Sequence, residues 1–327
     1  MLGAGSWGTA LAIQVARGGR SARLWGRDVG HVLEMDAERC NRRYLPNAPF
    51  PDNLQLEAEL PAALEGVDDV LVAVPSQGFR ELLLRIKPLL KKSQRLCWAT
   101  KGFEIETGRL PNEVAHEVLG AARPMAVLSG PTFAREVGAG LPTAMTIAAT
   151  DVEYAETLAY DFSSANFRAY TSTDITGVEV GGAVKNVLAI GAGLSDGLGF
   201  GANSRIALIT RGLSELTRLG EALGAQRETF MGLAGLGDVV LTCTDDQSRN
   251  RRFGLLLARG LSVDAALQEI GQVVEGYHAA RAVKRVAGRE SVMMPICAGI
   301  CGVLYDGLAA SDVVLGLMRR PIKPEFD

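Results

Sequence analysis

The 327-residue chain begins with a glycine-rich segment, Gly3-Ala4-Gly5-Ser6-Trp7-Gly8, that limits its possible folds more than any other feature. In such a GxGxxG pattern the first glycine permits a tight turn, the second lets a phosphate approach the backbone, and the third lets a helix pack closely. A helical pattern follows over residues 9–16 and stops at Gly18-Gly19. Free N–H groups at the start of that helix suit a pyrophosphate. We therefore predict a dinucleotide-binding fold.

The strand that should precede this motif is nearly absent, because only Met1 and Leu2 come before it. A central strand normally makes ladder hydrogen bonds on both sides. We expect the first strand of the sheet to be truncated, with reduced stability or weaker cofactor binding as the consequence.

The pattern of the chain changes about halfway along it. Short apolar runs alternate with helical patterns in the first half, which is typical of βαβ units. The expected strands are residues 22–25, 69–74, 95–99, 126–128, 144–148 and 167–170. Long helical patterns follow at residues 178–194, 204–223, 248–259, 262–270 and 277–285. The fold class we predict is an α/β Rossmann-type domain with a parallel-rich sheet over residues 1–173, and an all-α substrate and catalytic domain over residues 174–327, with a cleft between them.

Composition excludes several classes of function. The net charge of −3 gives no global attraction to nucleic acid or to an anionic membrane. The apolar stretch 178–194 is shorter than the ~20 residues of a membrane span and contains Glu179 and Lys185, so we expect a buried helix. The start lacks the features of an export signal. The three histidines are widely spaced and form no metal-ligand pattern.

The cysteines favour a reducing, cytoplasmic setting. They are odd in number and lack paired spacing. We expect the last two, one helical turn apart, to be core residues. The five are Cys40, Cys97, Cys243, Cys297 and Cys301.

Loops after the expected strands carry the first candidate site residues. Residues 74–76 (VPS), 100–102 (TKG) and 129–131 (SGP) should line one crevice, because ligands bind beyond the carboxyl ends of parallel strands. Lys101 is assigned to the substrate's oxygens, the alternative being a surface charge. After the strand at 22–25, Arg27 favours NADP(H) through a 2′-phosphate, and Asp28 keeps NAD(H) open. The alternative for Arg27 is a solvated arginine.

Lys185 lies in the apolar segment of residues 181–190, where a charged side chain is costly. Burial should lower the pKa of its ammonium, so that it could exchange a proton with a hydroxyl as a hydride leaves the carbon. The alternative is a lysine that extends to solvent. Asp238, set among glycines, is a candidate to orient this ammonium.

A polar cluster from Thr242 to Arg252 supplies a candidate phosphate site. Ser248 is a good N-cap, so Arg249 and Asn250 should lie in the first helical turn, where a bound anion would offset the charge of the arginine. Thr242 is included among the candidate substrate contacts. The alternative is a solvated basic face paired with acidic neighbours.

Long sequence blocks now show a resemblance. They are GAGSWGTA at the start, ATKGFE at 99–104, SGPTFAREV at 129–137, GGAVKNVLAIGAGLSDGLGFGANSR at 181–205, GLAGLGDVVLTCTDDQSRNRRFG at 232–254 and GQVVEGYHAA at 271–280. Over essentially its whole length the chain resembles the bacterial NAD(P)-dependent glycerol-3-phosphate dehydrogenases.

The resemblance implies transfer of a hydride between NAD(P)H and dihydroxyacetone phosphate, for phospholipid synthesis, by a cytoplasmic enzyme that forms homodimers. It also implies a C-terminal domain similar to that of 6-phosphogluconate dehydrogenase. The implied cofactor contacts are Ser6, Trp7, Arg27, Lys101, Ala134, Arg249, Val273 and Glu275, beside the motif glycines Gly3, Gly5 and Gly8. The implied substrate contacts are Lys101, Gly130, Thr132, Asp238, Ser248, Arg249 and Asn250, with Lys185 as proton acceptor. The alternatives are a related 6-phosphogluconate or hydroxyacid dehydrogenase, and a non-catalytic nicotinamide sensor.

Overall fold

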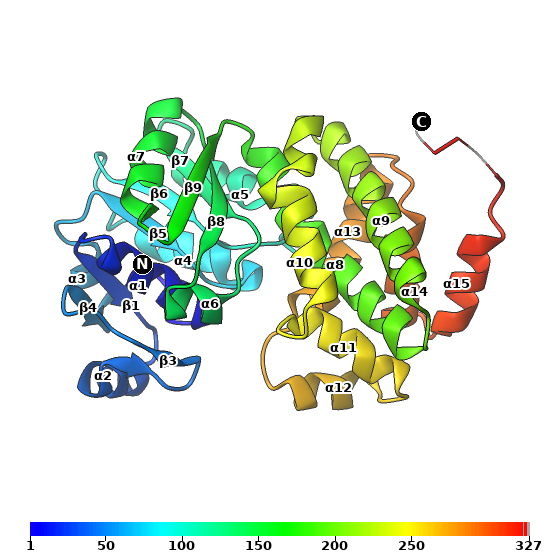
Figure 1. The fold of residues 1–327 in the computed structure, drawn as a ribbon. Coiled ribbons are helices and arrows are strands. Elements are labelled where there is room, and N and C mark those ends of the chain that lie inside the picture. The colour runs from blue at the N-terminus through cyan, green and yellow to red at the C-terminus, as the bar shows by residue number, and fades with distance from the viewer. Residues whose placement is uncertain (323, 326–327) are drawn as a thin grey trace. The chain divides into compact units, whose positions relative to one another are not determined.

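The computed structural model describes residues 1–322, 324 and 325, and it divides into two compact units. Unit 1 comprises Met1–Gly182 and Gly224–Asp238, and unit 2 comprises Ala183–Leu223 and Val239–Asp327. The predicted fold class is confirmed, since unit 1 is built around a sheet and unit 2 is helical (Figure 1). The boundary between units falls inside one long helix, nine residues after the division that we predicted.

The strands and helices of unit 1 alternate along the chain. Its strands are β1 (Ala22–Trp25), β2 (Cys40–Asn41), β3 (Leu45–Pro49), β4 (Leu54–Glu57), β5 (Asp69–Val72), β6 (Arg95–Trp98), β7 (Met125–Ser129), β8 (Thr143–Ala149) and β9 (Phe167–Ser172). Its helices are α1 (Ser6–Arg17), α2 (Val29–Glu38), α3 (Leu60–Leu64), η1 (Ser76–Gly78), α4 (Phe79–Ile86), α5 (Pro111–Leu119), α6 (Ala134–Ala139), α7 (Val152–Phe162), η2 (Arg227–Met231) and the π-type turn η3 (Leu233–Gly237). The six predicted strands are all present.

The sheet of unit 1 has the order β5-β6-β7-β8-β9, and a parallel pair, β1-β4, lies beside it. Leu2 joins the two parts, because it bridges Trp25 on one side and Val72 on the other, and its N–H donates to the Leu71 carbonyl at 2.7 Å. At the position of the expected first strand, Leu2 is thus a single bridging residue. β7 and β8 are antiparallel, whereas the other neighbours in the five-stranded sheet are parallel, so the sheet is parallel-rich as predicted.

Both faces of the sheet are buried, which explains why its strands read as continuous apolar runs. Successive residues of β5 belong to different core clusters: Leu71 packs with the α1 and α7 side, and Val70 and Val72 pack with the α4 and α5 side. The amphipathic helix α4 shows how one face is covered, since its buried residues recur with helical spacing. They are Phe79, Leu82, Leu83 and Ile86.

Unit 2 is a set of helices packed around α8 (Ile175–Gly197), the helix that contains the unit boundary. The other helices are α9 (Ala202–Ala222), α10 (Asp238–Thr244), α11 (Arg249–Ala258), α12 (Val263–Ile270), α13 (Glu275–Arg289), α14 (Pro295–Tyr305) and α15 (Ala310–Met318). α8 is long and apolar enough to cross a bilayer, but 89% of its most apolar window is buried inside the protein. The expectation of a buried helix is therefore confirmed.

Glycines allow α8 and α11 to cross with their backbones in contact. A Cβ on Gly193 of α8 would overlap the carbonyl of Arg251, and one on Gly254 of α11 would overlap the carbonyl of Ile190. Since neither helix could give way without losing its own hydrogen bonds, this crossing fixes the rotation of α8 within unit 2. Lys185 and Asn186 lie on the same helix, within two turns of the crossing.

Candidate active site

The glycine loop of unit 1 has the geometry that its sequence predicts. Gly3 has a φ of 123°, and a Cβ there would lie 2.7 Å from the carbonyl oxygen of Ala73. A Cβ on Gly8 would overlap the Gly3 carbonyl, so this glycine lets α1 pack against the turn. Gly5 has open space where its Cβ would be, and α1 begins at Ser6 with no side chain capping it. The exposed N–H groups and open backbone fit the pyrophosphate of a dinucleotide.

Arg27, Asp28 and Trp7, which were considered as cofactor contacts, have different surroundings. Arg27 follows β1 and is exposed. Asp28 instead caps α2, because its carboxylate accepts a hydrogen bond from the N–H of His31 at 3.1 Å. The indole Nε1 of Trp7 is buried with no partner among the described residues, so it is a donor available to a ligand.

The loops after β5 and β6 meet at one edge of the sheet. The hydroxyl of Thr100 donates to the Val74 carbonyl at 2.7 Å, and the Cα of Gly102 lies beside the hydroxyl of Ser76. Lys101, between these two residues, extends its ammonium to the carboxylate of Asp238, with Nζ and Oδ2 2.8 Å apart. The side chain of Asp238 is 1% exposed and that of Lys101 12% exposed, so this ion pair is buried.

The loop after β7 joins the same neighbourhood of unit 1. Gly182 is close to both loops, since a Cβ there would lie 3.3 Å from Cγ of Lys101 and 3.5 Å from the hydroxyl oxygen of Ser129. That hydroxyl is buried and has no partner among the described residues. Ser129 was not among our candidates, although it stands in the SGP segment, and its signal is a polar residue at the end of a wholly buried strand.

Two other candidates of this loop are also placed. Thr132 donates its hydroxyl to the Gly130 carbonyl at 3.2 Å, and Ala134 begins α6. At Gly130 a Cβ would lie 2.9 Å from Cα of Met145, so β8 leaves no room for a larger residue. The three predicted loops therefore do gather at one edge of unit 1.

An ion pair joins the segment that follows Lys101 to helix α4. Arg80 binds both carboxylate oxygens of Glu104, with Nε to Oε1 at 2.7 Å and Nη2 to Oε2 at 3.0 Å, and Thr107 donates to the same carboxylate. The hydrogen bonds from Arg80 lower the pKa of Glu104. A bidentate pair of this kind restrains the loop that carries Lys101.

In unit 2 the candidate residues are held by a chain of neutral amides. Lys185 is buried, and its neighbour Asn186 accepts a hydrogen bond from Nδ2 of Asn250 at 2.9 Å. The side-chain oxygen Oδ1 of Asn250 accepts a hydrogen bond from the N–H of Gly276 at 2.8 Å. Nδ2 of Asn186 donates to the carboxylate of Glu275 at 3.1 Å. Asn186 was missed from the sequence, although an amide in an apolar helix is the same signal that singled out Lys185.

The start of α11, the predicted phosphate site, has the N-cap that the sequence predicts. Ser248 is the N-cap, and its hydroxyl accepts from the N–H of Arg251 at 3.2 Å. Arg249 contacts Gln272 at 3.5 Å, whereas Arg251 takes the carboxylate partners, Asp246 and, at 2.6 Å, Asp196. Asp246, the acidic neighbour in the sequence, therefore pairs with Arg251. Arg249 is the first residue of α11.

The remaining candidates of unit 2 lie on or beside two of its helices. Thr242 lies on α10 and is buried. Val273 is 44% exposed and comes just before α13, which begins at Glu275. Asp238, expected to orient Lys185, has Lys101 as its partner within unit 1.

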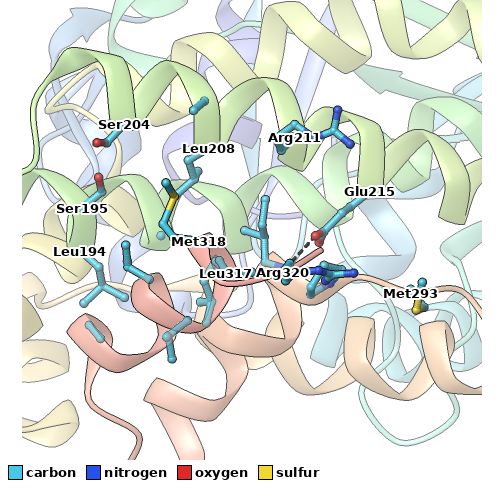
Figure 2. Close-up of a pocket in the computed structure, with 18 of the residues that line it drawn as sticks. Leu194, Ser195, Ser204, Leu208, Arg211, Glu215, Met293, Leu317, Met318 and Arg320 are labelled. Carbon is cyan, nitrogen blue, oxygen red and sulfur yellow. Dashed lines mark hydrogen bonds between the residues drawn. The ribbon is translucent and has the colours of Figure 1, made fainter. Parts of the chain in front are cut away.

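Unit 2 also contains a cavity of about 1300 Å³ that none of these candidate residues lines. Its walls come from α8, α9, α14, α15 and the segment after α15, and most of its lining side chains are apolar. Figure 2 shows Leu194, Leu208, Leu317 and Met318 gathered in it, with Arg211, Glu215 and Arg320 beside them. This cavity is thus separate from the candidate site residues of unit 2.

Among the described residues, no group of three or more His, Cys, Asp or Glu side chains could hold a metal ion. No disulfide joins any two of the five cysteines, all of which lie in the described part of the chain. Cys297 and Cys301 are buried on α14, which confirms them as core residues. Cys97 is also buried, and burial raises the pKa of its thiol to about 12, so it is not a nucleophile at neutral pH.

Together, a dinucleotide-type glycine loop, a helical second unit and lysines buried among polar partners define a two-domain NAD(P)-dependent oxidoreductase. Comparisons with known proteins identify the family. The family model described as NAD-dependent glycerol-3-phosphate dehydrogenase N-terminus matches residues 1–155, and the corresponding C-terminus model matches residues 174–315. The chain belongs to this family.

Individual relatives agree with the family models over nearly the full chain. Glycerol-3-phosphate dehydrogenase [NAD(P)+] of Tolumonas auensis is 56% identical over 326 residues, which are 99% of this chain and 98% of the relative. The Yersinia pestis protein of the same name is also 56% identical, over 99% of this chain and 96% of the relative. The crystal structure of glycerol-3-phosphate dehydrogenase from Coxiella burnetii matches with a TM-score of 0.94 and 48% identity, covering 98% of each chain.

Proposed function

We propose that this chain catalyses the reversible transfer of a hydride between NAD(P)H and dihydroxyacetone phosphate, which gives sn-glycerol 3-phosphate for glycerophospholipid synthesis. Relatives that are 56% identical over 99% of the chain carry the name glycerol-3-phosphate dehydrogenase [NAD(P)+]. The observation that carries the proposal is the buried Lys101–Asp238 pair, at the edge of the sheet where the glycine loop opens.

The glycine loop would hold the cofactor by its pyrophosphate. The N–H groups at the start of α1 face the open side of Gly5, and Ser6, Trp7 and Ala134 complete this half of the site. In unit 2, Arg249, Val273 and Glu275 are the proposed cofactor contacts. When bound, the nicotinamide supplies or accepts the hydride.

Lys185 is the proposed proton donor and acceptor. In reduction its Nζ gives a proton to the carbonyl oxygen of dihydroxyacetone phosphate, and in oxidation it takes the proton of the hydroxyl. Lys101 is proposed to bind the substrate's oxygens with its ammonium, which Asp238 holds in place. Gly130 and Thr132 are the further contacts proposed in unit 1.

The start of α11 is proposed to hold the phosphate. Its first N–H groups and the guanidinium of Arg249 can bind the phosphate oxygens with charge-assisted hydrogen bonds. Ser248 shapes this helix start as its N-cap. The side chain of Asn250 is tied to Asn186 and Gly276, so its part in holding the phosphate is mainly to fix the first turn. Thr242, on the neighbouring α10, is a proposed further contact.

NADP(H) is the proposed preferred cofactor. Arg27 is exposed after β1, where it can pair with a 2′-phosphate. Asp28, the residue that could bind a ribose 2′-hydroxyl, already accepts a hydrogen bond from the backbone of α2. A homodimer in the cytoplasm is the proposed working form. The free thiols are in keeping with a reducing compartment.

One assay tests the proposal. The purified chain is mixed with NADPH or NADH and dihydroxyacetone phosphate, and loss of reduced-cofactor absorbance is followed, with 6-phosphogluconate and unphosphorylated hydroxy acids as control substrates. We expect turnover with dihydroxyacetone phosphate and a higher kcat/KM for NADPH. Turnover of a control substrate alone would support the related dehydrogenase, and cofactor binding without turnover would support a sensor.

Two variants in the same assay test the residue roles. Lys185→Ala should lower turnover by at least about a hundredfold, because a general acid and base is lost. Arg249→Ala should raise KM for dihydroxyacetone phosphate far more than for dihydroxyacetone. Wild-type turnover of the first variant, or equal effects of the second on both substrates, would refute the assignment concerned.

A further inference from the structure

Glu179 is a buried carboxyl group of unit 1 that the proposed reaction does not use. It lies on α8 and is 4% exposed. Its Oε1 accepts two hydrogen bonds, from the indole Nε1 of Trp98 at 2.8 Å and from the backbone N–H of Asn112 at 3.0 Å. Trp98 is the last residue of β6 and Asn112 lies in the first turn of α5, so one oxygen atom joins three elements.

The second oxygen atom of this carboxyl group has no hydrogen-bond donor among the described residues. Oε2 of Glu179 and Oδ1 of Asn112 are both buried, and neither has a donor among the described residues. Buried polar atoms are nearly always paired, so two unpaired acceptors on residues already bonded to each other require an explanation. Burial raises the pKa of Glu179 well above its ordinary value, and the negative charge of Glu113 on α5 acts in the same direction.

We propose that Glu179 is a neutral carboxylic acid whose Oε2–H donates to Oδ1 of Asn112, and that it is a positioning residue for Lys101. The proton gives each of the two unpaired oxygen atoms a partner. Three residues after Trp98 the chain reaches Lys101, and three residues after Glu179 it reaches Gly182, whose Cα lies against the Lys101 stem. The bond from Trp98 to Glu179 therefore fixes α8 beside the loop that directs Lys101 to Asp238.

A second buried glutamate provides a matched contrast. Glu215 on α9 also has a raised pKa because of burial, but both of its oxygens accept backbone hydrogen bonds at the start of α14. Oε1 accepts from Ile296 at 2.7 Å and Oε2 from Cys297 at 3.1 Å. In Glu215→Gln, the side-chain NH₂ group would face a backbone N–H of α14, so two donors would oppose each other. In Glu179→Gln, the NH₂ group would lie where the carboxyl proton is proposed to lie. The same substitution should have opposite results at the two positions.

The experiment compares Glu179→Gln, Glu179→Leu and Glu215→Gln in the full chain. Glu179→Gln should keep the wild-type melting temperature and kcat, and Glu215→Gln should lower the melting temperature. Glu179→Leu should lower kcat about tenfold or more, because a small displacement of a substrate-positioning group has that size of effect. Its affinity for NADPH, measured by fluorescence titration, should change far less than kcat, since the glycine loop is not touched and Lys101 is only one of the expected cofactor contacts.

Infrared spectroscopy at neutral pH tests the proton directly. The C=O stretch of a protonated carboxylic acid should be present in the wild type and lost in Glu179→Gln. If no band is lost and Glu179→Gln is destabilised as much as Glu215→Gln, the carboxyl is ionised, the Asn112 amide is reversed, and the proposal fails.

The positioning role has its own decisive outcome. It rests on the proposed role of Lys101, and wild-type kcat in Glu179→Leu would overturn it. If that variant does not fold, Trp98→Phe, which removes the indole N–H but keeps an aromatic ring, takes its place with the same expectation for kcat. The infrared result does not depend on turnover, so failure of the proposed reaction would appear in the wild type and remain distinguishable from failure of this inference.

Discussion

In unit 1 the proposed site is held by an ion pair, whereas in unit 2 it is held by a chain of neutral amides. Lys101 and Asp238 are 2.8 Å apart and nearly excluded from water. Asn250, Asn186 and the start of α13 are linked by hydrogen bonds of similar length that carry no net charge until they reach Glu275.

The difference lies in what is left behind when one member is removed. Loss of an ion-pair partner leaves a charge in a poorly solvated place, and loss of an amide leaves only an unpaired dipole. A residue that must present a positive charge to a substrate needs a counter-charge when no substrate is bound. A helix start that presents N–H groups needs only to be held still. The comparison therefore predicts a ranking of effects.

Asp238→Ala should have the largest effect on stability. It leaves the buried ammonium of Lys101 without its carboxylate, so the free energy of unfolding should fall by about 3–5 kcal/mol. Urea denaturation measures this change. The double variant Lys101→Met/Asp238→Leu should recover much of the loss, and Asp69→Ala, at a more exposed pair with Arg95, should cost less than the single change at 238.

Asn250→Ala should have an intermediate effect. It removes the partners of the Asn186 carbonyl oxygen and the Gly276 N–H, at a cost of about 1–3 kcal/mol in unfolding free energy. The same urea titration applies, with Asn53→Ala as the control because its amide bonds two carbonyls near the surface. A loss as large as that of Asp238→Ala would show that charge is not what separates the two units.

Arg80→Met should have the smallest effect, and only above acidic pH. Arg80 lowers the pKa of Glu104, so this pair adds stability above the ordinary glutamate pKa and loses it as the pH falls through the lowered value. We expect less than about 1 kcal/mol at neutral pH, because the pair is partly exposed. Thermal unfolding at neutral and acidic pH checks this.

The control for this pair is Arg42→Met, at the more exposed pair with Glu38, which should change almost nothing. A difference between wild type and Arg80→Met that grows with acidity would contradict the sign of the pKa shift.

Local features of the molecule could be predicted from the sequence. The glycine loop, the strand at residues 22–25 and the N-cap at Ser248 follow from short-range chemistry, and the structure has them all. The small strands β2, β3 and β4 were missed because they are short and contain polar residues, and β3 also contains two prolines. The antiparallel pairing of β7 and β8 was missed because apolar runs do not encode strand direction.

Long-range partnerships were beyond the sequence. Asp238 pairs with Lys101, which is 137 residues away in the chain, and this partnership was not predicted; the expectation that Asp238 orients Lys185 stays a prediction. The contact of Glu179 with Trp98 spans 81 residues and depends on where β9 ends. Ser172 of β9 pairs with Ala148 of β8, Ala148 pairs with Val127 of β7, and Val127 pairs with Trp98 of β6. Because of this register, α8 starts where Glu179 can reach the indole of Trp98. Residue types could suggest these groups as important, but only the fold could pair them.

The discontinuity of unit 1 has a consequence for how the protein is made. Gly224–Asp238 returns to unit 1 after α9 has left it, so during synthesis the sheet and Lys101 exist before Asp238 has emerged. A fragment ending at Gly182 would lack that counter-ion and the η2 and η3 turns. Expressed alone, such a fragment should be prone to aggregation, and supplying the missing segment in the same chain should rescue it. The Lys101–Asp238 ion pair is therefore also a marker that folding of unit 1 is complete.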